Sequence, residues 1–293
     1  MDVITTVQEM RRWRAGWPLG ASVGLVPTMG YLHEGHLSLV RRACAENEGV
    51  VVSIFVNPIQ FGAHEDLERY PRDLPRDLRL LEAQGVHAVF VPTAAEMYPP
   101  KFITYVEPSG PLASEAEGAS RPGHFRGVAT VVLKLLNLVQ PQRAYFGQKD
   151  AQQVAVIKAL VADLNLPVEL VVMPTLREPD GLAMSSRNSY LSPQGRRAAT
   201  VLYRALLAGK TAYEQYQSED PAAIQRAMSE VVASEPLARL DYADVRDPGT
   251  FEPLERLRPP ALLAIAAFVE RARLIDNFLL RADGTWETGI IAS

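Results

Sequence analysis

The chain has 293 residues, enough for one large domain or two unequal ones. Hydrophobic residues make up 47% and charged residues 22%, the composition of an ordinary globular protein with a substantial core. The net charge of −4 excludes a general attraction to nucleic acid or to anionic membranes, so any bound anion needs a local site.

The cysteine content and the length of the apolar runs indicate in which compartment we expect the protein. Cys44 is the single cysteine, so neither a disulfide within the chain nor a cysteine-rich metal site is possible. The first 17 residues lack the apolar stretch of a signal peptide. The longest apolar run, Ala261–Val269, is far shorter than the ~20 residues that span a bilayer. We therefore expect a cytoplasmic protein without membrane or nucleic-acid partners.

Up to about residue 180, short strand patterns alternate with helical ones. The β-branched runs typical of buried parallel strands are Ser22–Val26, Val50–Val56, Ala88–Val91, Ala144–Phe146 and Val168–Met173. Stretches with apolar residues three and four apart, typical of helices, are Leu37–Ala45, Leu74–Gln84, Gly127–Val139 and Ala151–Leu164. This alternation predicts an α/β fold with a mostly parallel sheet covered on both faces. Between the third strand and the third helix, residues 107–123 are rich in Gly, Ser, Pro and Ala and predict a mobile loop.

The pattern changes after Arg187. Ser192 is placed as an N-cap, and a helix is predicted from about Pro193 to Gln217, followed by a second from Pro221 to Ala233. Three strand patterns then occur, at Leu240–Val245, Ala261–Val269 and Arg273–Leu280. These elements predict a small α+β domain, so we divide the chain into domains at residues 1–181 and 182–293.

Polar residues that could carry chemistry follow the first strand. Residues 27–36 read Pro-Thr-Met-Gly-Tyr-Leu-His-Glu-Gly-His, and a helix begins there. His33 and His36 share one face of that helix start, whose free N–H groups and partial positive charge suit a phosphate. Gly35 lets a flat base or ribose approach the backbone. Helix-capping or surface histidines remain an alternative, as does a zinc site, although only two ligands are evident.

Amides follow the second strand. Residues 56–62 read Val-Asn-Pro-Ile-Gln-Phe-Gly, and amides with both donors and acceptors suit a hydroxy acid. A turn stabilised by Asn57 explains the segment equally well.

The strand that ends near Phe146 leads into another polar group. Lys149 offers a point charge to a phosphate, and Gly147 permits close approach of a nucleotide. Asp150 either accepts hydrogen bonds from a ribose or caps the next helix, and Gln153 lies one helical turn further on.

The last polar segment is Met-Ser-Ser-Arg-Asn at residues 184–188. Its two hydroxyls and its guanidinium suit phosphate oxygens. Taken alone, the segment is also typical of a solvated connection.

Together these strings resemble a known family. The first one is similar to the His-x-Gly-His signature of the nucleotidyltransferase superfamily, which includes class I aminoacyl-tRNA synthetases. With the segments at 56–62, 70–72 (Tyr-Pro-Arg), 121–125 (Arg-Pro-Gly-His-Phe), 146–150 and 184–188, the order and spacing resemble the pantothenate synthetase family over essentially the whole chain. Gln148 stands where many relatives carry Glu, a common variant.

The resemblance implies a fold and a reaction. The fold is a Rossmann-like, doubly wound parallel sheet with a second, smaller α+β domain that closes over the site. The reaction uses ATP to convert pantoate to pantoyl adenylate with release of pyrophosphate, and the amine of β-alanine then displaces AMP to give pantothenate. Mg²⁺ at the β- and γ-phosphates and a homodimer are also implied.

The resemblance also assigns roles to residues. The implied catalytic set, with His36 as proton donor, is His33, His36, Lys149, Ser185, Ser186 and Arg187. The implied ATP-binding residues are Met29, Gly30, Tyr31, Leu32, His33, Glu34, Gly35, His36, Gly147, Gln148, Lys149, Asp150, Leu176, Met184, Ser185, Ser186 and Arg187. Gln60 and Gln153 are implied to bind pantoate, Gln60 also β-alanine, and Asp77 to help hold the metal.

Three other functions fit part of the sequence. Another nucleotidyltransferase of the superfamily would share the phosphate-binding segments but lack the glutamine pair. A tRNA-charging enzyme is disfavoured because no basic surface or anticodon-binding domain is evident. A non-catalytic nucleotide-binding regulator is disfavoured because every charged catalytic candidate is present.

Overall fold

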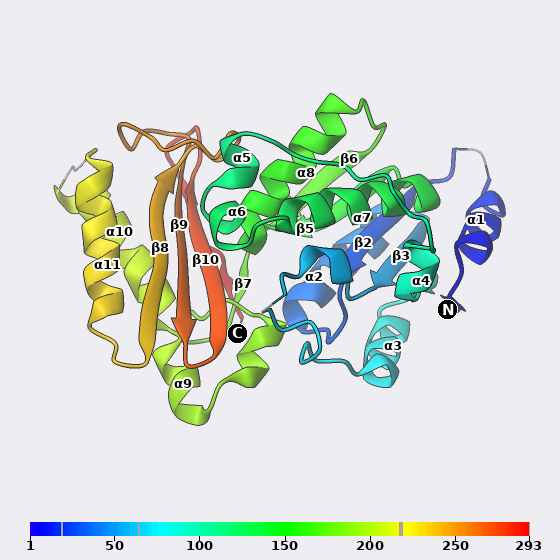
Figure 1. The fold of residues 1–293 in the computed structure, drawn as a ribbon, viewed down its shortest axis with the longest axis horizontal. Coiled ribbons are helices and arrows are strands. Elements are labelled where there is room, and N and C mark those ends of the chain that lie inside the picture. Colours follow the sequence, from blue (N-terminus) through cyan, green and yellow to red (C-terminus); the bar gives the residue numbers. More distant parts are fainter. Residues whose placement is uncertain (19, 64, 217–218, 293) are drawn as a thin grey trace. The chain divides into compact units, whose positions relative to one another are not determined.

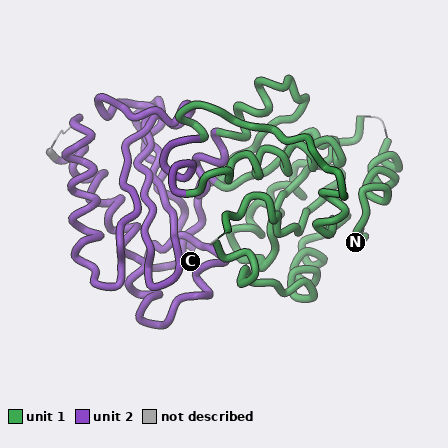
Figure 2. The backbone as a smooth tube through the Cα atoms, in the orientation of Figure 1, with its two compact units in different colours: residues 1–113, 121–147, 156–173 green, residues 114–120, 148–155, 174–293 purple. Residues whose placement is uncertain are grey.

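The structure, a computed structural model, describes residues 1–18, 20–63, 65–216 and 219–292. Contacts divide the chain into two compact units, coloured separately in Figure 2. The first comprises residues 1–113, 121–147 and 156–173, and the second comprises residues 114–120, 148–155 and 174–293. The division into domains at residues 1–181 and 182–293 stays a prediction.

The first unit is built on a six-stranded parallel sheet with strand order β1-β4-β3-β2-β5-β6 (Figure 1). The strands are β1 (Asp2–Ile4), β2 (Val23–Thr28), β3 (Gly49–Ile54), β4 (Ala88–Phe90), β5 (Arg143–Gly147) and β6 (Glu169–Met173). The prediction of a parallel α/β sheet is confirmed. β1, which sequence analysis missed, is only three residues long and pairs with β4.

Helices alternate with these strands. They are α1 (Val7–Ala15), α2 (Glu34–Glu46), α3 (Leu74–Ala83), α4 (Ala94–Met97), α7 (His124–Val139) and α8 (Ala151–Asp163). The six residues of β3 are all buried, because a strand covered on both faces needs apolar side chains throughout. Helix α1 went unpredicted although Thr6 and Glu9 form a capping box at its start.

The strand order reverses beside β2. The chain runs from β2 outward through β3 to β4, then returns to β5 on the other side of β2 and continues to β6. In open parallel sheets, ligands bind outside the carboxyl ends of the strands at such a switch point. Within the first unit, the segments that follow β2 and β3 begin at this edge of the sheet, and each carries a motif that sequence analysis singled out.

The second unit contains an antiparallel sheet of β8 (Ala238–Arg246), β9 (Ala261–Val269), β10 (Ala272–Leu280) and β11 (Trp286–Glu287). Helices α10 (Val201–Tyr216) and α11 (Pro221–Ala233) pack against this sheet around a shared apolar core (Figure 1). A further pair of short strands, β7 (Leu176–Arg177) and β12 (Ile290–Ile291), is parallel. The predicted small α+β unit is thus present.

The single helix predicted from Pro193 to Gln217 is wrong. Helix α9 (Pro193–Ala198) ends before α10 begins, and Gln217 lies outside the described residues. The Thr200 hydroxyl donates to the Arg197 carbonyl at 2.8 Å, which competes with the regular helical bond. Residues 199 and 200 separate the two helices.

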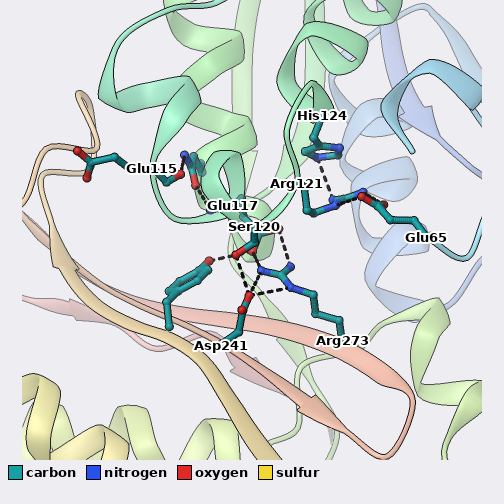
Figure 3. Close-up of polar contacts among 10 residues, drawn as sticks. Glu65, Glu115, Glu117, Ser120, Arg121, His124, Asp241 and Arg273 are labelled. Carbon is teal, nitrogen blue, oxygen red and sulfur yellow. Dashed lines mark hydrogen bonds and ion pairs between the residues drawn. The ribbon is translucent and has the colours of Figure 1, made fainter. Parts of the chain in front are cut away.

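The predicted loop at residues 107–123 contains two single-turn helices, α5 (Pro111–Ser114) and α6 (Glu117–Ser120). Residues 114–120 are anchored within the second unit (Figure 3). Glu117 receives two hydrogen bonds from Arg273 at 2.7 and 2.9 Å and one from the Tyr242 hydroxyl at 3.0 Å. Arg273 also binds Asp241, which accepts from the Ser120 hydroxyl at 2.9 Å. Side-chain charges therefore hold this segment in place.

Helix length and hydropathy bear on membrane insertion. In the part of the chain that the structure describes, no helix is both long and apolar enough to cross a bilayer.

Candidate active site

The turn after β2 is held by a buried carboxylate. Asp77 of α3 accepts the backbone N–H of Tyr31 at 2.7 Å and of Leu32 at 2.8 Å. Gly30 has φ +81°, and a Cβ there would lie 2.9 Å from Ile54 and 3.1 Å from Asp77. Burial raises the pKa of the Asp77 carboxyl, while these backbone hydrogen bonds oppose the shift. The turn therefore requires both the glycine and the carboxylate.

The two histidines lie side by side at the start of α2. Their ring centroids are 4.0 Å apart, and the His33 backbone N–H donates to His36 Nδ1 at 3.3 Å. Because Nδ1 of His36 accepts, its Nε2 carries the proton in the neutral ring. The structure thus brings His33 and His36 together and selects a tautomer that can donate from Nε2.

The Gln60 side chain is oriented by two neighbours, Asn57 and Met29. Asn57 Nδ2 donates to Gln60 Oε1 at 2.9 Å, and Gln60 Nε2 lies 3.2 Å from the Met29 sulfur. Asn57 is itself held, because it donates to the Gly127 carbonyl at 3.1 Å and accepts from the Tyr98 hydroxyl at 2.8 Å. Asn57 and Gln60 are both buried. Asn57 therefore fixes which way the Gln60 amide faces.

The Gln60 backbone is held by a second set of contacts. His124 Nδ1 donates to the Gln60 carbonyl at 2.9 Å, and Arg121 donates to His124 Nε2 at 3.1 Å (Figure 3). Arg121 also binds both carboxylate oxygens of Glu65, at 2.6 and 3.0 Å. Burial raises the pKa of Glu65, but the bonds from Arg121 outweigh it and lower the pKa below its usual value. A pocket of about 230 Å³ lies beside this chain of contacts, lined by residues 59–61, 105, 122–124, 126 and 127.

In the second unit, the turn that follows β5 is held through its backbone. Asn277 Nδ2 donates to the carbonyls of Gln148 at 3.0 Å and Lys149 at 2.9 Å. Gln148 Nε2 returns a hydrogen bond to Asn277 Oδ1 at 3.2 Å. The Lys149 side chain is one-fifth exposed, and its Nζ lies 3.8 Å from Asp150, so the ammonium is accessible to an anion.

The serine and arginine segment follows a short hairpin. Leu176 and Met184 pair through a backbone hydrogen bond of 2.9 Å, and Gly181 occupies the turn with φ +90°. A Cβ at Gly181 would lie 2.2 Å from the Tyr203 ring, so only glycine fits. Beyond Met184, the Ser185 hydroxyl accepts the Arg187 backbone N–H at 3.3 Å.

Gln153 lies on the first turn of α8 and is half-buried. Its neighbour Gln152 is fixed by residues 114–120. Gln152 Oε1 accepts the Glu117 N–H at 3.0 Å, and its Nε2 donates to the Glu115 carbonyl at 2.9 Å. This pairing sets the start of α8 and hence the position of Gln153.

Within the first unit, the structure thus brings Met29 and Gln60 into contact and stacks His33 with His36. Of the other predicted residues of that unit, Gly30, Tyr31 and Leu32 lie between β2 and α2, and Glu34 and Gly35 lie on the first turn of α2. Asp77 lies on α3, and Gly147 ends β5. The predicted residues of the second unit lie within two segments, residues 148–153 and 176–187. The role of each in binding stays a prediction.

Sequence analysis missed residues that support the site. His124 and Arg121 were noted only as part of a string, Arg177 was assigned no role, and Asp276 and Asn277 were not noted at all. A signal was present, since Asp276 and Asn277 are adjacent polar residues inside a strand that is otherwise mostly apolar. Among the described residues, no group of three or more His, Cys, Asp or Glu side chains is arranged to hold a metal.

Known proteins resemble this chain over nearly its whole length. The family model described as pantoate–β-alanine ligase matches residues 2–279. The pantothenate synthetase of Roseiflexus castenholzii is 58% identical over 282 residues, which are 96% of this chain and all of that protein. The crystal structure of pantothenate synthetase from Thermus thermophilus is similar with a TM-score of 0.89 and 53% identity, over 94% of this chain and 98% of that one.

A third relative was solved with ligands. The pantoate–β-alanine ligase from Francisella tularensis, complexed with β-γ ATP and β-alanine, has a TM-score of 0.78 and 34% identity. The match covers 95% of this chain and 97% of that one.

Proposed function

The chain belongs to the pantoate–β-alanine ligase family, and we propose that it joins pantoate to β-alanine through a pantoyl adenylate made from ATP. The observation that carries the proposal is the oriented Gln60 amide, which offers a donor and an acceptor to a hydroxy acid beside the turn that follows β2. The ligand-bound relative from Francisella tularensis supports ATP and β-alanine as substrates.

In the first step, a carboxylate oxygen of pantoate attacks the α-phosphorus of ATP, and the bond to pyrophosphate breaks. Negative charge builds on the transferring phosphate and on the leaving group, so positioned donors lower the barrier. We assign this role to His33, His36, Lys149, Ser185, Ser186 and Arg187. The remaining ATP contacts come from residues 29–32, 34, 35, 147, 148, 150, 176 and 184.

In the second step, the amine of β-alanine attacks the acyl carbon of pantoyl adenylate, and AMP leaves. Gln60 and Gln153 orient pantoate, and Gln60 also contacts β-alanine. His36 acts as proton donor, and its hydrogen bond from the His33 backbone supports this role because that bond leaves the proton on Nε2.

Magnesium fits this chemistry as part of the nucleotide complex. The described residues offer no cluster of three or more protein ligands, and Mg²⁺ commonly keeps several waters and binds substrate phosphates. Asp77 is the candidate protein ligand, although both of its oxygens accept backbone N–H groups. When bound, the ion would neutralise charge on the β- and γ-phosphates.

We also propose a cytoplasmic homodimer, as the resemblance implies. A lone cysteine suits a reducing compartment. Closure of the smaller unit over the site stays a prediction.

Exchange of labelled pyrophosphate into ATP tests the order of the steps. We expect pantoate alone to support exchange, because the adenylate forms and reverts before the amine is needed. Exchange that appears only when β-alanine is added would contradict the adenylate and favour a concerted reaction.

Alanine at Gln60 or Gln153 tests the pantoate contacts. Losing an amide that pairs with a buried polar group costs about 1–3 kcal/mol, so the pantoate Kd should rise roughly 5- to 150-fold. The ATP Kd should change little. Asn57→Ala should weaken pantoate binding in the same direction, because it releases the Gln60 amide. Binding titrations with each substrate measure these effects, and an equal loss for ATP would rule out the assignment.

A further inference from the structure

Two adjacent side chains of β10, Asp276 and Asn277, hold two different segments of the second unit. Their exposed fractions are 3% and 4%, so both polar groups lie in the interior. Successive side chains of a strand point to opposite faces, which lets neighbours in the chain bind different partners. The partners here are the turn that carries Lys149 and the hairpin that leads to Met184–Arg187.

Asn277 holds the first segment. Three hydrogen bonds join its side chain to Gln148 and Lys149. Both N–H donors of the Asn277 amide bind the backbone carbonyls of these two residues. The bonds fix the backbone on both sides of the Lys149 nitrogen, so they set the direction in which that side chain leaves the turn. No other residue type of the same shape supplies two donors and an acceptor.

Asp276 holds the second segment through a fully buried arginine. Arg177 donates to the two Asp276 oxygens at 2.6 and 2.9 Å, and its exposed fraction is 0%. The same guanidinium donates to the Gly181 carbonyl at 3.0 Å and to the Thr288 carbonyl. It also lies over the rings of Tyr203 and Phe278, at 4.8 and 5.3 Å from their centroids. The hairpin is thereby fixed at its turn, directly before Met184.

The two anchors are coupled through the strand. The Asn277 backbone N–H donates to Asp276 Oδ1 at 2.8 Å, on the carboxylate that Arg177 binds. β10 is itself paired along its whole length with β9, where Asp276 faces Ile265 and Asn277 faces Ala264. The two polar residues therefore lie on a strand that is hydrogen-bonded to its neighbour along its whole length, which suits residues that position others.

We propose that Asp276 and Asn277 are positioning residues that hold the Lys149 turn and the Met184–Arg187 segment in register for binding the phosphates of ATP. They do not touch the nucleotide and act through the backbone of residues that do. The assignment rests on the proposed function, which places Lys149 and residues 185–187 at the phosphates.

The test is Asn277→Asp, which keeps the size of the side chain but replaces its two donors with an acceptor facing two carbonyls. Misplacing a catalytic group by about 1 Å can cost about 10²-fold, so we expect pantoate-dependent pyrophosphate exchange to fall at least 10-fold, with a raised KM for ATP. Amide hydrogen exchange across residues 146–153 should become faster. Should this variant not fold, Asn277→Ser, which retains one donor, should show the same changes to a smaller extent.

The matched control is Asp220→Ala. It removes the N-cap hydrogen bond of α11, in the same unit, without touching either phosphate-binding segment. We expect a loss of thermal stability and unchanged exchange kinetics. The proposal is overturned if Asn277→Asp leaves the exchange rate and the KM unchanged, or if Asp220→Ala impairs both as strongly. Wild-type protein without pantoate-dependent exchange would instead refute the proposed function, while hydrogen exchange would still report on the anchor.

Discussion

Lys149→Ala is expected to slow pantoate-dependent pyrophosphate exchange by about 10²- to 10³-fold, the usual effect of losing one preorganised donor to developing charge. Its ammonium is the point charge that the turn after β5 presents, and the carbonyl of the same residue is fixed by Asn277. The fold should be unaffected. Among the described residues, the side chain makes only a distant ion pair with Asp150, which is half exposed, and such pairs contribute at most about 1 kcal/mol.

Lys158→Ala is the control for this experiment. Lys158 lies on α8 and is exposed, so its removal changes net charge by the same amount without altering the turn. Rates of pyrophosphate exchange, measured at saturating ATP and pantoate, distinguish the two variants. Equal activity in Lys149→Ala and Lys158→Ala would show that Lys149 is not a phosphate ligand.

The parallel sheet, and the position of the polar segments just beyond its strand ends, could be predicted because the signals are local. A strand buried on both faces is continuously apolar, and the polar string at residues 27–36 directly follows such a strand. The same holds for Gln60 and Lys149, each of which lies just beyond a strand end. Placement at the carboxyl edge follows from the topology of parallel sheets and needs no knowledge of side-chain contacts.

The supporting residues could not be predicted, because their partners are distant in sequence. Asn277 binds Lys149 across 128 positions, and Arg177 binds Asp276 across 99. Nothing in the local pattern around Arg177 states that its side chain is buried, since arginine is rarely so. Likewise, residues 114–120 are held by hydrogen bonds from Arg273 to Glu117, which is 156 positions away in the sequence. The local composition, rich in small residues and proline, predicts only a loop.

Disruption of the Arg177–Asp276 pair should have the largest effect on stability. In Asp276→Asn, the guanidinium stays in the interior without a counter-charge, and breaking a buried pair in this way costs about 3–5 kcal/mol. At roughly 2–4 °C per kcal/mol, the melting temperature of the transition that includes the second unit should fall by roughly 10 °C. Thermal unfolding followed by circular dichroism measures the change.

Two further variants isolate the charge effect from the loss of one hydrogen-bonding group. Glu214→Gln breaks an exposed pair with Lys210 on α10, and such pairs contribute about 0.3–0.5 kcal/mol, so its melting temperature should stay near that of the wild type. Arg177→Met combined with Asp276→Leu removes both charges and should cost less than the sum of the two single changes, because neither charge is then left unpaired. It should not restore full stability, since the Gly181 and Thr288 carbonyls lose their donor. If Asp276→Asn costs no more than Glu214→Gln, the pair is solvated in solution, and the anchoring of the hairpin through β10 loses its physical basis.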